Sequence, residues 1–180
     1  MNGKTKDIAF TGIAAAIIAV CSFITIPVGA VPVTLQTFAV CLVSGILGLK
    51  RGTLSVLIYI LIGALGVPVF SGFKGGIGVL LGATGGYIIG FVFTAMITGF
   101  VSDRTKKLPA LMLSMALGAA ICYAFGTAWF ILVYTKEQMP LGKTLALCVT
   151  PFLIPDAVKI TVASLLTFRL RDRLLKTQDG

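Results

Sequence analysis

The sequence predicts an all-α integral membrane protein, a single domain over residues 1–180 with six transmembrane helices. Of the 180 residues, 57% are hydrophobic and only 12% are charged, whereas about a quarter of the residues in a soluble domain are charged. The hydrophobic residues form blocks, each about long enough to cross the roughly 30 Å hydrocarbon core of a bilayer. The basic residues gather at the ends of these blocks. These three observations together predict the fold class.

The six spans are expected at residues 8–26, 32–49, 53–66, 84–101, 109–134 and 151–168. Proline disfavours a helical conformation in the residue before it, so Pro27 closes the first span and Pro68 follows the third. The segment 72–78, between the third and fourth spans, contains too much glycine for a helix. The stretch 142–149 can lengthen the sixth span up to the break at Pro151. The sequence therefore predicts a glycine-rich loop between helices 3 and 4.

Lysine and arginine predict the orientation, because cytoplasmic loops retain positive charge. One set of segments carries eleven basic residues: Lys4, Lys6, Lys50, Arg51, Arg104, Lys106, Lys107, Arg169, Arg171, Arg173 and Lys176. The opposite set carries three: Lys74, Lys136 and Lys143. This alternation fits six spans with both termini in the cytoplasm and the glycine-rich loop outside. No cleavable signal is expected, because no small-residue cleavage site and polar mature sequence follow the first apolar block.

Composition excludes several classes of function. The net charge of +9 does not indicate a nucleic-acid partner, because the basic residues lie at the ends of apolar blocks. The chain has no histidine, which excludes a His-based metal site and a Ser-His-Asp triad, so we expect neither a metal site nor a catalytic site. The cysteines form no CxxC pair and are interpreted as small apolar side chains. They are Cys21, Cys41, Cys122 and Cys148.

Asp156 and Lys159 are the only charged residues in the apolar segment 149–168. A charge in lipid costs about 2.5 kcal/mol or more, so such residues tend to face a cavity or the bundle interior. Three residues apart, they share one face of a helix. Asp156 precedes Arg169 by about 13 residues, or roughly 20 Å of helix, which places the pair in the outer half of the membrane. The pair is our first candidate for a ligand site.

The two side chains suit a polar ligand. Pro155 is expected in the first helical turn, which would place the Asp156 carboxylate at the positive end of the helix dipole. This carboxylate can accept from ligand N–H groups, and Lys159 can donate to a carboxylate or a carbonyl. The alternative is structural: Asp156 caps the helix, and Lys159 pairs with it or extends its ammonium group towards the interface.

The glycine-rich sequence continues into the fourth span. The segment 72–78 is expected to fold over a binding cavity, since irregular backbone at membrane depth is tolerated only where it is buried or lines a cavity; a flexible connector is the alternative. Gly82, Gly86 and Gly90, continued by Thr94 and Thr98, are spaced by four residues. Such a stripe of small residues predicts close packing of a neighbouring helix.

Neither glycine pattern in the chain predicts nucleotide binding. Leu81 stands where a GxGxxG fingerprint requires its last glycine, and Glu137 stands where a Walker A loop ending at Gly142-Lys143-Thr144 requires its first. We therefore expect no ATP hydrolysis by this chain. If transport is active, a partner must supply the energy.

Several further residues are candidates for contacts. Gln36 can donate to a ligand or bond a neighbouring helix. Tyr87 and Trp129 are candidate cavity walls, with an interfacial anchor as the alternative for Trp129. Ala15 and Ala19 put small side chains on one side of the first helix, where they serve either packing within the bundle or docking of another membrane protein.

The chain resembles the BioY family, the substrate-binding S components of energy-coupling factor (ECF) transporters for biotin. The resemblance rests on motifs that occur in order along nearly the whole chain: Pro32-Val-Thr-Leu-Gln-Thr37, Gly48-Leu-Lys-Arg-Gly52, Gly66-Val-Pro-Val-Phe-Ser-Gly72, Gly75-Gly76, Gly82-Ala-Thr-Gly-Gly-Tyr87, Gly126-Thr-Ala-Trp129 and Ile154-Pro-Asp-Ala-Val-Lys159. Two positions depart from the family pattern. Ala83 stands where the family commonly has proline, and Pro155 where it commonly has glycine.

The resemblance implies the following roles. Asp156 and Lys159 contribute to the biotin site, and the outer loop and the start of the next helix line it. The loop and helix residues concerned are Gly75, Gly76 and Tyr87. Ala15 and Ala19 match the surface that contacts the transmembrane coupling subunit, and the location is a prokaryotic plasma membrane.

These expectations combine into one functional hypothesis. The chain is expected to capture biotin, as a transported ligand and not a cofactor, at the outer side of the membrane. It would deliver biotin inward together with a transmembrane coupling subunit and two ATPase subunits, surrounded by membrane lipid. One alternative is a stand-alone secondary transporter of a small organic anion. An intramembrane enzyme is less compatible with the sequence, since no nucleophile–base pair is visible.

Overall fold

The structure, a computed structural model, describes residues 3–28, 31–134 and 140–179. Its elements are α1 (Gly3–Phe23), β1 (Thr25–Ile26), β2 (Val33–Thr34), α2 (Gln36–Ala64), α3 (Ile77–Leu80), α4 (Gly85–Arg104), α5 (Leu108–Trp129), the π-helix η1 (Phe130–Tyr134), α6 (Leu141–Cys148) and α7 (Thr150–Asp179). In this part of the chain, five helical segments are long and apolar enough to cross a membrane. The prediction of an all-α membrane protein is confirmed.

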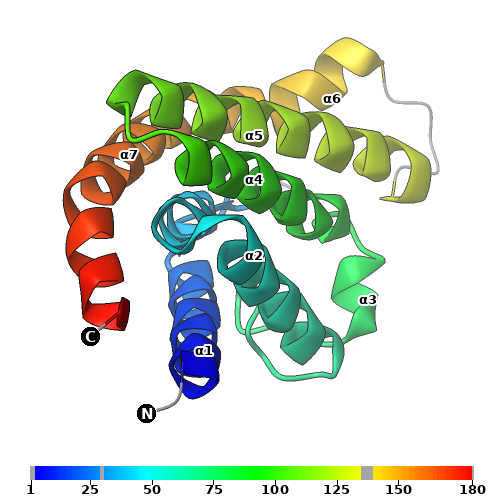
Figure 1. The fold of residues 1–180 in the computed structure, drawn as a ribbon. Helices are drawn as coiled ribbons and strands as arrows, with labels where there is room; N and C mark the ends of the chain where they lie inside the picture. Colours follow the sequence, from blue (N-terminus) through cyan, green and yellow to red (C-terminus); the bar gives the residue numbers. More distant parts are fainter. Residues whose placement is uncertain (1–2, 29–30, 135–139, 180) are drawn as a thin grey trace.

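The second and third predicted spans lie together in α2, which is interrupted at Gly48. This residue has φ 76° and ψ −171°, outside the helical region. A Cβ on Gly52 would lie 2.6 Å from the Cα of Ser44, although eight residues of straight helix would separate the two by about 12 Å along the axis. The chain therefore folds back at Gly48, and Figure 1 shows α2 as two differently directed segments.

Asp103, near the end of α4, fixes this fold-back. Its Oδ2 accepts the backbone N–H of Leu49 at 2.9 Å, and its Oδ1 accepts from Arg171 of α7 at 2.8 Å. A Cβ on Gly48 would collide with the same carboxylate. Glycine is needed at position 48 both for the left-handed φ and for the approach of Asp103.

The connection between α1 and α2 is extended, and this corrects two predicted helix ends. Helix α1 ends at Phe23 and not at residue 26, and α2 begins at Gln36 and not at residue 32. The intervening strands pair antiparallel, with Thr25 opposite Thr34 and Ile26 opposite Val33. β-branched side chains favour extended structure, so this stretch leaves the helical conformation early.

Helix α4 packs between α2 and α5 (Figure 1). The small-residue stripe predicted for the fourth span makes this packing close. A Cβ on Gly90 would lie 2.8 Å from the Sγ of Cys122, and one on Gly86 would collide with Trp129. Thr94 donates to the carbonyl of Gly118 at 2.9 Å. The core of the bundle lies along this face of α4, as predicted.

Helix α7 packs against α2 and α5 and begins at Thr150, so Pro155 lies inside it. The prediction that Pro155 occupies the first turn, with Asp156 at the helix N-terminus, is therefore wrong. The preceding residues form α6 (Leu141–Cys148), a separate short helix next to α7. An interior proline gives up its bond to the carbonyl of residue i−4, here Pro151, and other groups must stabilise Asp156.

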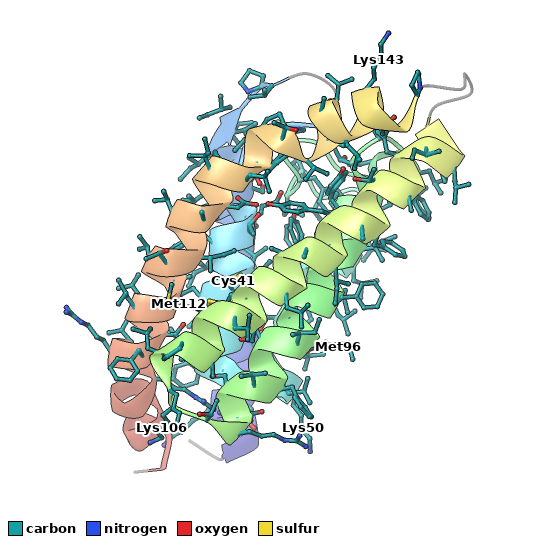
Figure 2. The ribbon with its side chains drawn as sticks, turned by 90° about the horizontal axis from the view of Figure 1, so that it is seen from above. Cys41, Lys50, Met96, Lys106, Met112 and Lys143 are labelled. Atoms are coloured by element: carbon teal, nitrogen blue, oxygen red, sulfur yellow. The ribbon has the colours of Figure 1, made fainter. Side chains whose placement is uncertain are left out.

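The two ends of the molecule carry different basic residues. Figure 2 shows Lys50 and Lys106 at one end and Lys143 at the other. The beginning of α1 and the end of α7 lie at the end that carries Lys50 and Lys106 (Figures 1 and 2). The groups that the sequence assigns to the inner and outer sides are thus separated along the length of the bundle.

Candidate functional site

A cavity of about 300 Å³ lies at the end opposite the fold-back of α2. Its walls come from the strand region 25–37, the loop 70–74, the first turns of α4, and the facing parts of α5 and α7. Aromatic and aliphatic side chains form most of the surface, among them Phe70, Ile88, Phe91 and Phe152. A mostly apolar wall with a few polar groups is typical of pockets for small molecules, which span roughly 300–1,000 Å³.

Asp156 is the most deeply buried charged group of the cavity wall, with 2% of its surface exposed. Its Oδ1 lies 2.7 Å from the ammonium group of Lys159, and its Oδ2 accepts a hydrogen bond from the hydroxyl of Tyr123 on α5. Pairing of this kind is what makes a buried carboxylate tolerable. Lys159 and Tyr123 thus stabilise the carboxylate, a role that the sequence had suggested for the N-terminus of the helix.

Lys159 pairs with Asp156 and also binds the β2 strand. Its ammonium group also donates to the backbone carbonyl of Thr34 at 2.6 Å, and its side chain is 11% exposed without belonging to the cavity wall. Lys159, Asp156 and Tyr123 therefore connect α7, the β2 strand and α5. An ionised carboxylate has about four acceptor positions, and two protein donors leave capacity for a donor inside the cavity.

Gln36 lines the cavity and also bonds within the protein. It is 4% exposed, and its Nε2 donates to the hydroxyl of Tyr59 at 2.6 Å. Gln36 and Tyr59 lie on opposite sides of the fold-back at Gly48, so this bond ties the two segments of α2 together next to the cavity. The structure shows the predicted bond to a neighbouring helical segment, and donation to a ligand stays a prediction.

Tyr87 forms part of the cavity wall. Its hydroxyl lies 3.2 Å from both the carbonyl of Cys148 and the Oγ1 of Thr127. Its ring stacks near Phe152 with a centroid distance of 6.4 Å. The side chain thus offers an aromatic face to the cavity while its polar end holds α4 to α5 and α6.

Three of the predicted site residues do not line the cavity: Gly75, Gly76 and Trp129. A Cβ on Gly75 would lie 2.7 Å from the carbonyl oxygen of Gly66. Gly76 has φ 94°, and its N–H donates to the carbonyl of Gly63 at 2.7 Å. The indole N–H of Trp129 donates to the carbonyl of Gly82 at 3.3 Å. The structure thus gives these three residues a role in holding the loop and the start of α4.

Ala15 and Ala19 pack within the bundle, which is one of the two roles predicted for them, and docking of another membrane protein stays a prediction. Ala15 is 4% exposed, and Ala19 packs against the core. Along residues 5–23 of α1, the exposed glycine and alanine residues are Ala9, Gly12 and Ala16, flanked by the exposed residues Ile13, Ile17 and Val20. At about 100° per residue, position 19 lies about 20° from position 12 and position 15 about 60° from it, so Ala15 and Ala19 border Gly12 and Ala16 on the side of α1 that faces the core.

Four residues at or next to the cavity were not predicted from the sequence: Tyr123, Tyr59, Lys74 and Phe70. A tyrosine within an apolar span carries a hydroxyl that needs a partner, and this signal could have indicated Tyr123 and Tyr59. Lys74 was used only to predict the orientation in the membrane, although it lines the cavity. Among the described residues, no group of three or more Cys, Asp or Glu side chains could hold a metal ion.

Comparisons with known proteins agree on one family. The family model described as "BioY family" matches residues 1–176. The chain is 41% identical to the biotin transporter BioY of Thermotoga maritima, over 92% of this chain and 96% of that protein. It is 39% identical to the probable biotin transporter BioY of Pyrococcus horikoshii, over 93% and 98% of the two chains.

A solved structure has the same fold. It is the crystal structure of the S-component for biotin from an ECF-type ABC transporter, with a TM-score of 0.86 and 28% sequence identity. The match covers 95% of this chain and 93% of that one. The similarity therefore extends over nearly the whole fold.

Proposed function

Because the chain belongs to the BioY family, as its motifs indicated, we propose that it is a membrane subunit that binds biotin for uptake. The matched relatives are transporters, so the prediction that the chain is not an enzyme is confirmed. The observation that carries the proposal is Asp156, a carboxylate held by Lys159 and Tyr123 in the wall of an otherwise mainly apolar cavity.

The chemistry of biotin suits this cavity. The ureido ring of biotin carries N–H donors, and the carboxylate of Asp156 has acceptor capacity directed at the cavity. The remainder of the bicyclic ring and the aliphatic chain are apolar, and Phe70, Phe91 and Phe152 offer apolar surface. Gln36 and Tyr87, both in the wall, complete the set of polar groups around the ligand.

The membrane arrangement we propose has six crossings, with the segments of α2 on either side of Gly48 crossing separately. The fold supports this, because residues 31–37 and 70–74, which flank the two ends of α2, meet at the cavity while Gly48 lies at the other end. Both termini are then cytoplasmic and the cavity opens outward, in a prokaryotic cell membrane. The separation of Lys50 and Lys106 from Lys143 agrees with this orientation.

Delivery of biotin into the cell requires partners, which we propose to be an ECF transmembrane coupling subunit and two ATPase subunits. The chain has no nucleotide-binding motif, and the structurally similar S-component comes from an ECF-type ABC transporter. The exposed face of α1 with Gly12 and Ala16 suits close approach of a partner helix, and Ala15 and Ala19 border this face. A stand-alone secondary transporter would need ligands for a coupling ion, and Asp156 is the only carboxylate among the described residues of the cavity wall.

Two measurements test the function. Mass spectrometry of small molecules that co-purify with the detergent-solubilised chain should identify biotin, and titration should show saturable biotin binding. Vesicles that contain the chain together with the coupling and ATPase subunits should accumulate biotin only with ATP. Accumulation by the chain alone that collapses with an ion gradient would contradict the proposal and favour a secondary transporter.

A further inference from the structure

The cavity wall contains a second charged group, which the proposed function does not yet use. Among the described residues that line the cavity, Lys74 and Asp156 are the only charged ones. Asp156 is buried, whereas Lys74 is exposed on the outer loop. Within the described part of the chain, no ion pair involves Lys74. The cavity thus combines a buried carboxylate with an ammonium group at its solvent-exposed rim.

The backbone of Lys74 is fixed by a tight turn. Phe70 and Lys74 exchange backbone hydrogen bonds, with N···O distances of 2.9 and 3.3 Å. The ring of Phe70 is 1% exposed, lies edge-on to Tyr59 with centroids 5.5 Å apart, and fills the space beside Gly63. The turn is therefore anchored in the core at its first residue, and Lys74 leaves it on the cavity side.

The tip of the turn is fastened to the end of α1. Gly72 and Phe73 both have positive φ, 72° and 56°, and a left-handed phenylalanine is unfavourable without compensating contacts. The ring of Phe73 stacks on Phe23 with a centroid distance of 4.3 Å. The hydroxyls of Ser71 and Thr25 lie 2.9 Å apart. Because the turn is held on both sides, only the flexible stem of Lys74 needs to move when its ammonium group meets a ligand.

Lys159 is not available for the same task. Its ammonium group is bound to Asp156 at 2.7 Å and to the carbonyl of Thr34 at 2.6 Å, and it does not line the cavity. A ligand with a carboxylate at one end and N–H donors at the other therefore meets one cavity-lining cation, Lys74, and one cavity-lining anion, Asp156.

We propose that Lys74 binds the carboxylate of the ligand's aliphatic tail, while Asp156 receives the N–H groups of its ring. This inference rests on the proposed function and adds an orientation to it: the ring lies inward and the tail points to the outer rim. An ion pair at a partly exposed rim contributes modestly to affinity, about threefold to tenfold, and its main effect is selectivity for a free carboxylate.

The test compares biotin with biotinamide, whose tail is uncharged, in equilibrium competition assays on the full-length purified chain. We expect the wild-type protein to prefer biotin about threefold to tenfold. Lys74→Met keeps most of the side-chain stem and should reduce this preference to about one, with biotinamide affinity unchanged. Lys74→Arg should retain the preference. Lys143→Met, which removes a second outer lysine outside the cavity, is the matched control and should behave as wild type.

A wild-type preference that persists in Lys74→Met would overturn the inference, as would equal affinity of the wild-type protein for the two ligands. Either result leaves the proposed function intact, because biotin still binds. A wild-type chain that binds neither ligand would instead refute the proposed function, and the role of Lys74 with it. Loss of both ligands in Asp156→Asn, with the preference altered only in Lys74→Met, would support both proposals separately.

Discussion

The two ends of the molecule each contain an aspartate held by two partners, and the comparison separates a binding group from a structural one. Asp156 accepts from Lys159 and Tyr123, and Asp103 accepts from Arg171 and the N–H of Leu49. The side chain of Asp156 is 3% exposed, whereas that of Asp103 is 46% exposed. Asp156 lines a cavity, while Asp103 closes on the backbone of the α2 fold-back. A carboxylate marks a site when unused acceptor capacity faces an enclosed space.

The largest expected effect comes from removing the cation of the buried pair. Lys159→Met leaves the Asp156 carboxylate buried without its cation, which should cost about 3–5 kcal/mol of stability and weaken biotin binding at least tenfold. Arg171→Met is the matched change at Asp103, where solvent screens the carboxylate, and should cost about 1 kcal/mol or less. Thermal unfolding and biotin titration of both variants check this contrast; equal losses would contradict it.

The next largest effect is expected from Gly48→Ala, which tests the structural role of Asp103. It forces a left-handed alanine and places a methyl group against Asp103, so it should cost at least about 2 kcal/mol. Biotin affinity of the folded fraction should not change, because the fold-back lies at the far end from the cavity. Gly142→Ala, where a Cβ meets nothing within 4 Å, is the control in the same unfolding assay. A large loss of affinity in the folded Gly48→Ala protein would mean that the two ends are coupled.

A smaller effect is expected from Tyr123→Phe. The change removes one hydrogen bond to a charged group, worth about 1.5–3 kcal/mol, but keeps the ring and the pairing of Asp156 with Lys159. We expect biotin affinity to fall about threefold to tenfold, since Asp156 loses one constraint on its orientation. Unchanged affinity in Tyr123→Phe would remove Tyr123 from the site.

Much of the fold could be predicted from the sequence, because bilayer thickness and charge placement constrain it strongly. The fifth and last predicted spans each fall within one helical stretch of the structure, and the fourth begins one residue before α4. The break at Gly48 could not be predicted as an internal feature of α2, because its cause, the carboxylate of Asp103, lies far away in the chain. The extended pair around Thr25 and Thr34 was missed, since apolar β-branched residues also suit a membrane helix.

The site, like the fold, could be predicted from the sequence only in part. Asp156 stood out because a charge in an apolar segment is costly, and the spacing to Lys159 indicated their pairing. Whether Asp156 or Lys159 lines the cavity depends on the contacts of Asp156 with Tyr123 and of Lys159 with the carbonyl of Thr34. Both contacts join residues that are far apart in sequence. The register of α1 likewise depended on what packs against it, so the exposed small residues include Gly12 and Ala16 and not Ala15.

The central claim is that Asp156 binds the ligand and Asp103 only holds the fold. Biotin titration of Asp156→Asn and Asp103→Asn, side by side in detergent, tests it most directly. The amide keeps the size of each side chain and removes its charge. We expect biotin affinity to fall at least tenfold in Asp156→Asn and to stay at the wild-type value in folded Asp103→Asn. Wild-type affinity in Asp156→Asn would contradict the account.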